Sequence, residues 1–288
     1  MNKHVKIVTL IDLLFLCILL LSSLSGSSIL GRALYVAAFI LPTIVGIIAI
    51  HKAKKSSHPV AFVAFLELDD ENAVPPEIPT GLGISIKKEG ALLALPLIAP
   101  TVLLVFLLAA LSNYLGALVG LSAPAVDEPF ATALIMHALL PAVLEEMLFR
   151  YLPIKLIGEC GANMRYALFA SALFFALSHA NPIQIPYAFA AGIVLFVISV
   201  ITSSILPAIV IHLANNVISL LSSYGYMSTA AYVIFAAVLV ASAVAVILRR
   251  RAYVKKLAEY FSESSREFSY APLAFIIPAL LLTLLNTV

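Results

Sequence analysis

The chain has 288 residues, of which 62% are apolar and 11% are charged, and its formal net charge is +2. Soluble domains carry about 25% charged residues, so this composition excludes an ordinary soluble protein and indicates a lipid bilayer as the solvent. The small net charge, with no basic patch interleaved with aromatic residues, argues against a nucleic-acid partner. Cys17 and Cys160 lie far apart, so neither a disulfide framework nor a cysteine metal site is expected.

Nine apolar stretches are candidates for membrane-spanning helices, each of which needs about 20 mostly apolar residues, or fewer where protein surrounds it. The first follows two lysines and has the form of a signal peptide, but the eight stretches behind it favour an uncleaved helix. We therefore predict an all-α, polytopic transmembrane bundle of about eight or nine helices. The candidates are residues 7–24, 33–50, 91–112, 130–152, 166–180, 186–203, 206–222, 230–248 and 271–287.

The basic residues predict how this bundle is oriented. If every candidate crosses the bilayer, all but one of the 17 Lys and Arg residues lie in segments on one side, and Arg32 alone lies opposite. The positive-inside rule makes the basic side cytoplasmic, with the N-terminus inside and the C-terminus outside. A re-entrant pair of helices would preserve this arrangement. The expected localisation is an integral, multi-pass membrane protein with cytoplasmic basic loops.

The fourth candidate carries Glu145, Glu146 and Arg150 in an apolar setting. An ionisable group at the centre of a membrane helix costs at least about 2.5–3.5 kcal/mol, so such residues are functional candidates. Glu146 and Arg150 are four residues apart and share a helix face, which predicts an ion pair. Glu145 projects about 100° away and lacks this partner, which suits a general base. Alternatively, the two glutamates exchange roles, or all three residues reach for water at the cytoplasmic helix end.

His179 ends the fifth candidate, and a turn with two prolines leads into the sixth. Both candidates are short. A hairpin that does not fully cross the bilayer would bring His179 towards Glu145, whereas two full crossings would hold the two residues apart. A histidine at a helix end is also commonly an interfacial or packing residue. Small residues at 188–192 favour close approach of two helices over a lateral opening for a lipid chain.

The seventh candidate carries His212 and Asn216, four residues apart and therefore on one face. A histidine and an amide that point together into a bundle are suited to donate hydrogen bonds to an oxyanion. The alternative is a polar pair that joins helices, worth about 1 kcal/mol. His137 lies about two turns before Glu145, and we expect it to pack rather than to line a shared cavity.

Three motifs thus follow one another: Glu-Glu-x-x-x-Arg at 145–150, Phe-x-x-x-His at 175–179 and His-x-x-x-Asn at 212–216. Together they resemble the CPBP family of intramembrane peptidases (CAAX proteases and bacteriocin-processing enzymes), which includes the type II CAAX prenyl endopeptidase. The resemblance covers roughly residues 130–222. It implies a glutamate-dependent endopeptidase whose site opens towards the cytosol from within the membrane.

The resemblance also implies a role for each motif residue. Glu145 and His179 would activate the attacking water, and His212 and Asn216 would stabilise the oxyanion. Glu146 and Arg150 would support them. No cofactor is expected; the alternative is zinc, for which Glu145, His179 and His212 are chemically suitable ligands. The two histidines do not share one helix, however, as they do in the His-Glu-x-x-His arrangement.

On this interpretation the chain has three parts. Residues 1–129 form N-terminal transmembrane helices with a cytoplasmic loop at 51–90, and residues 130–222 form the catalytic core. Residues 223–288 form C-terminal helices with a basic amphipathic segment at 249–270, which would lie on the anionic inner leaflet.

The expected partners are the bilayer and a membrane-associated peptide or protein, prenylated in the nearest analogy. Nothing in the sequence specifies an oligomeric state. There are two alternatives to the peptidase function. A proton-coupled transporter would use the intramembrane Glu and His residues as a relay, although the sequence shows no internal repeat. A non-catalytic membrane scaffold of the same fold would need none of the motif residues, yet all are present.

Overall fold

The computed structural model describes residues 3–25, 29–52, 83, 88–121, 126–159 and 164–249. This part of the chain is helical, and its one β-type contact is an isolated bridge between Gly83 and Ser204. The all-α prediction is therefore confirmed for the described residues. The α-helices are α1 (Lys3–Leu24), α2 (Ile29–Lys52), α3 (Lys88–Leu118), α4 (Phe130–Ala133), α5 (Leu140–Glu146), α6 (Met164–Ser178), α7 (Gln184–Ile201), α8 (Leu206–Ser223) and α9 (Thr229–Arg249).

Six of the described helical stretches are long and apolar enough to cross a membrane, so the chain is an integral membrane protein. Helix α6, with 15 residues, is shorter than these six and corresponds to the candidate at 166–180, and α9 covers the candidate at 230–248. The candidate at 271–287, the basic segment beyond residue 249 and most of the predicted loop at 51–90 lie outside the described residues. The six stretches are Lys6–Leu24, Ile29–Lys52, Leu97–Leu118, Phe130–Leu156, Gln184–Ile201 and Leu206–Ser223.

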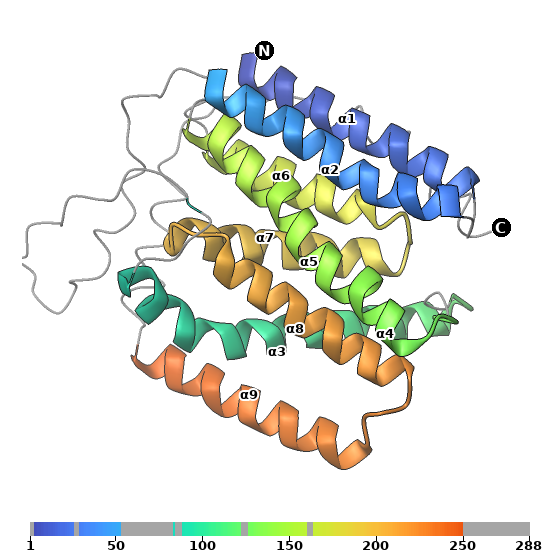
Figure 1. Cartoon of the computed structure of the whole chain (residues 1–288). Helices are drawn as coiled ribbons and strands as arrows, with labels where there is room; N and C mark the ends of the chain where they lie inside the picture. The colour runs from blue at the N-terminus through green and yellow to red at the C-terminus, as the bar shows by residue number, and fades with distance from the viewer. Residues whose placement is uncertain are drawn as a thin grey trace, which may run out of the picture.

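The helices form successive layers (Figure 1). The α1–α2 hairpin lies on one side, and Ser22 Oγ donates to the Gly31 carbonyl, 2.7 Å away, across its turn. A central group of α5, α6, α7 and α8 follows, and α3 packs against α7 and α8 and, on its other side, against α9. The motif helices are therefore enclosed between α1–α2 and α3.

The stretch from Phe130 to Glu159 is helical but not uniformly α-helical. Wider π-helical turns, η2 (Leu134–Leu139), η3 (Met147–Tyr151) and η4 (Ile154–Glu159), interrupt it. The two glutamates therefore end α5, and Arg150 lies on η3. Such π-type turns occur frequently at functional sites. Both η3 and η4 pack against the α1–α2 hairpin.

Helices α6 and α7 form a tight hairpin. A Cβ atom added at Gly192 would lie 2.9 Å from the Ala172 Cα, so the two backbones approach too closely for a larger residue. The predicted close helix approach at 188–192 is confirmed. Between the helices, the Asn181 side chain accepts from the backbone N–H groups of Ile183 (2.9 Å) and Gln184 (3.3 Å). This turn places the end of α6 beside the start of α7.

Candidate functional site

The motif residues converge in the middle of the bundle. Glu145 and Glu146 come from the end of α5, Arg150 from η3 and His212 from α8, and all four are buried. His179 follows the last residue of α6 and is half-buried. The sequence separates α5 from α8 by about sixty residues, but the two helices pack directly against each other.

Glu146 joins two elements through one oxygen atom. Its Oε1 lies 3.1 Å from Arg150 Nη1, and both side chains are completely buried. The ion pair predicted from the four-residue spacing is thus present. The same Oε1 lies 2.8 Å from His212 Nδ1. An ionised carboxylate only accepts hydrogen bonds, so Nδ1 of His212 is the donor. Glu146 therefore fixes the orientation of the imidazole on α8.

Glu145 has different surroundings. Its Oε2 lies 3.7 Å from His212 Nε2, its side chain is 10% exposed, and it lines a cavity that Glu146 does not reach. The two ring nitrogens of His212 thus face the two glutamates, one each. Of the two carboxylates, Glu145 is the one open to a substrate or water.

His179 is held by its own helix. Its Nδ1 lies 2.8 Å from the carbonyl oxygen of Phe175, one turn earlier. A carbonyl oxygen only accepts, so Nδ1 carries the proton, and in the neutral ring Nε2 is left as a proton acceptor. His179 lines the same cavity as Glu145. The turn at the end of α6 thus brings the two residues to one cavity. Helix α7 is long enough to cross a membrane, so a partial hairpin stays a prediction.

The aromatic residue of the Phe-x-x-x-His motif, Phe175, contacts several groups of the site through its ring. Its ring makes T-shaped contacts with the rings of His179 and His212, with centroid distances of 4.9 and 5.5 Å. The Arg150 guanidinium lies over the same ring, 4.0 Å from its centroid. Phe175 therefore positions three polar groups from three different elements without forming a hydrogen bond through its side chain.

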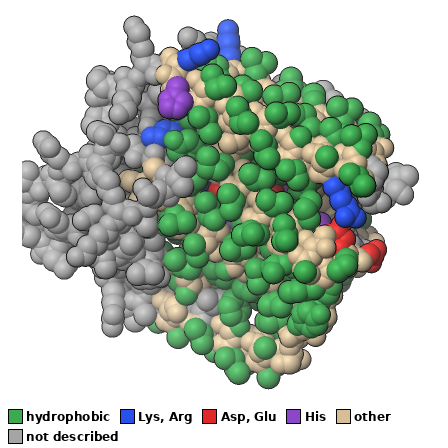
Figure 2. Space-filling view, viewed as in Figure 1, with side chains coloured by type: hydrophobic (Ala, Val, Ile, Leu, Met, Phe, Trp, Pro, Cys, Tyr) green, Lys and Arg blue, Asp and Glu red, His purple; other side chains and the backbone are tan. Residues whose placement is uncertain are grey.

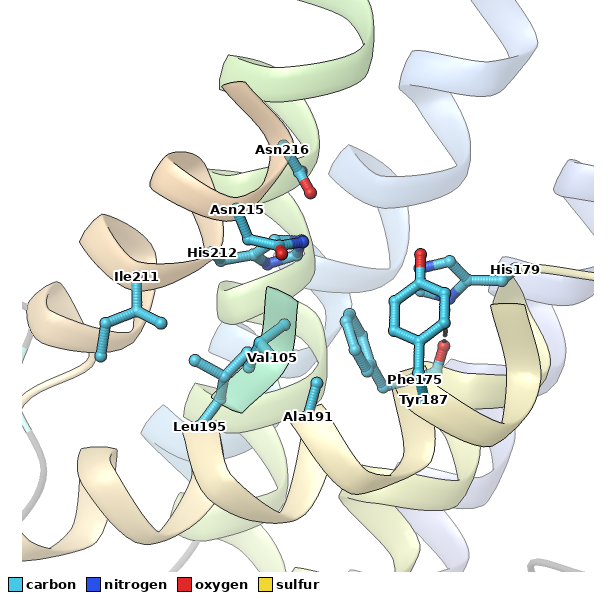
Figure 3. Close-up of a pocket in the computed structure, with 10 residues that line it drawn as sticks. All are labelled: Val105, Phe175, His179, Tyr187, Ala191, Leu195, Ile211, His212, Asn215 and Asn216. Carbon is cyan, nitrogen blue, oxygen red and sulfur yellow. Dashed lines mark hydrogen bonds between the residues drawn. The ribbon is translucent and has the colours of Figure 1, made fainter. Parts of the chain in front are cut away.

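A small cavity lies between the two histidines (Figure 3). Its volume of about 20 Å³ suits a single water molecule, because one water needs at least about 10–15 Å³ by this measure. Tyr187 and Asn216 contribute polar atoms to its wall. The complete lining is Val105, Phe175, His179, Tyr187, Ala191, Leu195, Ile211, His212, Asn215 and Asn216.

A second cavity, of about 690 Å³, begins at Glu145 and His212 and extends to the ends of several helices. At its rim Glu128 is paired with Arg32 (3.7 Å) and with His137 (3.4 Å). The expectation that His137 only packs is wrong, because its side chain is 50% exposed and lines this cavity together with Glu145. The wide turn of η2 keeps His137 and Glu145 on one face of the helix.

Sequence reasoning missed several residues of these cavities. Tyr187 on α7 lines both, and Tyr35 on α2 lines the larger one. Neither belongs to a motif, and a tyrosine in an apolar helix gives no distinctive signal. In α8 the sequence did indicate further cavity residues, because Asn215 and Ser219 lie at helical spacing from His212 and extend its polar face.

The described residues do not form a metal site. No group of three or more His, Cys, Asp and Glu side chains among them is arranged to hold a metal ion. In the alternative zinc set, Nδ1 of His179 is bonded to a carbonyl oxygen and both nitrogens of His212 face carboxylates. Glu145, His179 and His212 therefore do not fit a three-ligand zinc site in this arrangement. The expectation of a metal-free enzyme stays a prediction.

Comparison with known proteins finds a family that is similar to this region. Residues 127–218 match the family described as type II CAAX prenyl endopeptidase Rce1-like. No curated protein and no solved structure matches the chain. The matched segment is about a third of the chain and contains all six motif residues. The resemblance based on three short motifs is confirmed, since the segment that contains them is similar to the family described as type II CAAX prenyl endopeptidase Rce1-like.

Proposed function

We propose that the chain is an intramembrane endopeptidase that hydrolyses a peptide bond of a membrane-associated protein or peptide, with water activated by Glu145 and His179. One observation carries this proposal. A cavity with room for one water lies between His179 and His212, and it adjoins the larger cavity in which Glu145 is exposed. A water held there has proton acceptors on one side and hydrogen-bond donors on the other.

The reaction follows from these positions. The Nε2 of His179 and the Glu145 carboxylate each accept a hydrogen bond from the water, and one proton passes to this pair as the water oxygen attacks the scissile carbonyl carbon. The carbonyl oxygen becomes an oxyanion, to which Asn216 and His212 donate hydrogen bonds. When the tetrahedral intermediate collapses, the C–N bond breaks and the proton passes to the leaving amine. Each proton removed from the water is thus returned to a product.

The hydrogen bond between His212 and Glu146 supports this division of roles. Since Nδ1 of His212 donates to Glu146, the ring can also donate from Nε2 only when both nitrogens carry protons. In that form each ring nitrogen faces one carboxylate, Nδ1 that of Glu146 and Nε2 that of Glu145. Glu146 and Arg150 act as positioning residues, because both side chains are completely buried and line neither cavity.

The orientation in the membrane and the partners belong to the same proposal. We place the N-terminus and the basic segments in the cytoplasm by the positive-inside rule. The bilayer is the solvent, and the substrate is a membrane-associated chain, with a lipidated, CAAX-like C-terminus as the first class to test. No metal takes part in the proposed steps.

The test uses purified protein and a set of fluorogenic reporter peptides, with and without a prenyl group. Wild type should cleave at least one reporter. Glu145→Gln, His179→Ala and His212→Ala should each lower kcat, by about 10²–10⁴-fold for loss of a general base. His51→Ala is the control, because His51 is exposed at the far end of α2. Equal cleavage by wild type and all three site variants would refute the assigned site. Proton flux into liposomes without cleavage would favour the transporter.

A further inference from the structure

The two ends of the helix bundle differ in charge. Lys3 and Lys6 stand at the start of α1, Lys52 ends α2, and Lys88 begins α3. Figure 2 shows basic side chains gathered where α1 begins and α2 ends, whereas the opposite edge of the same view shows acidic side chains next to basic ones. At that end Arg32 is paired with Glu128. The start of α1, the end of α2 and the start of α3 therefore form one basic end of the bundle.

The lining of the large cavity includes helix ends that lie at the opposite end of the bundle. Ser22 and Ser23 close α1, Gln184 begins α7, and Ser223 ends α8; all four line the cavity. Asp127, just before α4, lines it too and is exposed. No residue from the basic ends of α1, α2 or α3 belongs to the lining. Within the described part of the chain, the cavity therefore opens away from the basic end.

Helix α8 provides a polar path along this opening. His212, Asn215, Asn216, Ser219 and Ser223 occupy one face at helical spacing, and all line the cavity. Their side chains run from buried at His212 to exposed at Ser219 and Ser223. Polar side chains are costly in contact with lipid, so a polar face on a spanning helix indicates water or a polar ligand beside it.

The wall of the cavity opposite α8 is formed by η2 and α5. His137, Pro141 and Glu145 follow one another at intervals of four residues, and all three line the cavity. Segment η2 and helix α5 both contact α8. The two polar faces thus enclose a passage that leads from the Glu128–His137 pair at the rim to Glu145.

The other direction is closed by apolar packing. Beyond Glu146, towards the basic end, the chain continues through side chains that are at most 2% exposed. They pack against α1 and α6 in the main apolar core, and none lines the cavity. These residues are Leu148, Phe149, Leu152, Ile154 and Leu156. A peptide could not reach Glu145 from the basic end without separating these side chains.

We infer that the catalytic site is entered from the end of the bundle opposite to the basic segments, which the positive-inside rule makes extracytoplasmic. The substrate is then a peptide segment presented on the extracytoplasmic side of the membrane. This reverses the expectation, drawn from the family resemblance, of a site that opens towards the cytosol. That the entering peptide is a substrate rests on the proposed peptidase function. The direction of access rests on charge and cavity geometry alone.

Cysteine labelling tests the direction of access without requiring any activity. Cys17 and Cys160 are first replaced by serine, and single cysteines are then introduced as Ser219→Cys in the passage, Ser223→Cys at the mouth and Lys52→Cys at the basic end. All three introduced positions are exposed, so the substitutions do not disturb the core. Intact and permeabilised cells of a bacterial expression host are treated with a membrane-impermeant maleimide.

We expect Ser219→Cys and Ser223→Cys to react fully in intact cells, and Lys52→Cys to react only after permeabilisation. Reaction of Ser219→Cys only after permeabilisation would overturn the inference, as would reaction of Lys52→Cys in intact cells. If Ser219→Cys disturbs folding, judged by the elution profile in detergent, Ser223→Cys gives the same decision. These results stand whether or not the protein cleaves any reporter.

A reporter experiment then connects access to chemistry. One peptide is tethered to a transmembrane anchor so that it lies outside the cell, and the same peptide is tethered to a second anchor so that it lies inside. The inference predicts cleavage of the external peptide, lost in Glu145→Gln, and no cleavage of the internal one. Cleavage of the internal peptide alone would overturn the inference while supporting the peptidase function.

Discussion

The Nδ1 atom of His212 on α8 lies 2.8 Å from Oε1 of Glu146 on α5, and the same oxygen lies 3.1 Å from Arg150 Nη1. One buried carboxylate therefore holds a histidine from another helix and a buried guanidinium from its own. Glu146 lines neither cavity, so in the proposed reaction it acts only through His212. This separates the two adjacent glutamates by their surroundings: Glu145 is exposed to the cavity, and Glu146 is enclosed between Arg150 and His212.

Glu146→Gln should destabilise the protein strongly. The substitution keeps the side-chain shape but leaves Arg150 buried without a counter-charge, and breaking a buried pair costs about 3–5 kcal/mol. Thermal unfolding in detergent measures the loss. Glu128→Gln is the matched control, because its partner Arg32 is 53% exposed and such pairs contribute about 0–1 kcal/mol. Equal shifts in Tm for the two variants would contradict the buried-pair interpretation.

Phe175→Leu should lower both stability and activity. The leucine keeps the backbone carbonyl that accepts from His179 but removes two T-shaped ring contacts and the cation–π contact with Arg150. Each ring contact contributes about 0.5–1.5 kcal/mol beyond its burial. Phe169→Leu is the control, since the Phe169 ring contacts that of Phe189 outside the site. A larger loss of kcat/KM in Phe169→Leu than in Phe175→Leu would show that the Phe175 ring does not position the histidines.

His179→Ala should abolish most of the activity while preserving the fold. Its imidazole is half-buried at a helix end, and the hydrogen bond that it makes is to its own helix, so little packing depends on it. Loss of a general base lowers kcat by about 10²–10⁴-fold. The Tm and the reporter KM should change little. A fall in Tm as large as that in Glu146→Gln would mean that His179 is chiefly structural.

Gly192→Ala should weaken the α6–α7 hairpin. The added Cβ would lie 2.9 Å from the Ala172 Cα, a backbone atom that cannot move alone, and overpacking of this kind costs about 1–3 kcal/mol. Gly116→Ala is the comparison, because there the Cβ would meet the side chain of Ile183 at 2.8 Å, which can change rotamer. Thermal unfolding should show the larger loss for Gly192→Ala, and the reverse order would argue against rigid packing of this hairpin.

Chelation of divalent metals should leave reporter cleavage unchanged, since the proposed steps use only side chains and water. Cleavage is measured before and after dialysis against a strong chelator, and then after zinc is added back. Loss of activity that zinc restores would establish a metal-dependent reaction and require a different arrangement of Glu145, His179 and His212.

Much of the fold was predictable because the relevant signals are local. Hydropathy identifies membrane helices from about 20 consecutive residues, and six of the predicted helices have the length to cross in the part of the chain that the structure describes. Helical periodicity likewise predicted that Glu146 pairs with Arg150, since residues four apart on a helix are neighbours. The α-helical class, the six motif residues and their family followed from such patterns.

Contacts between helices were decided only by the tertiary structure. Glu146 and His212 are 66 positions apart, and no spacing rule relates residues on different helices. The same holds for Tyr35 and Tyr187, which line the large cavity from α2 and α7, and for His137, whose position depends on the wide turn of η2. Packing also determined which end of the bundle is filled by apolar side chains and which is open. The sequence by itself thus determined the helical class and the three motifs, because hydropathy and spacing are properties of short segments, and only the packing of distant helices decided the partners of the motif residues and the cavities that they line.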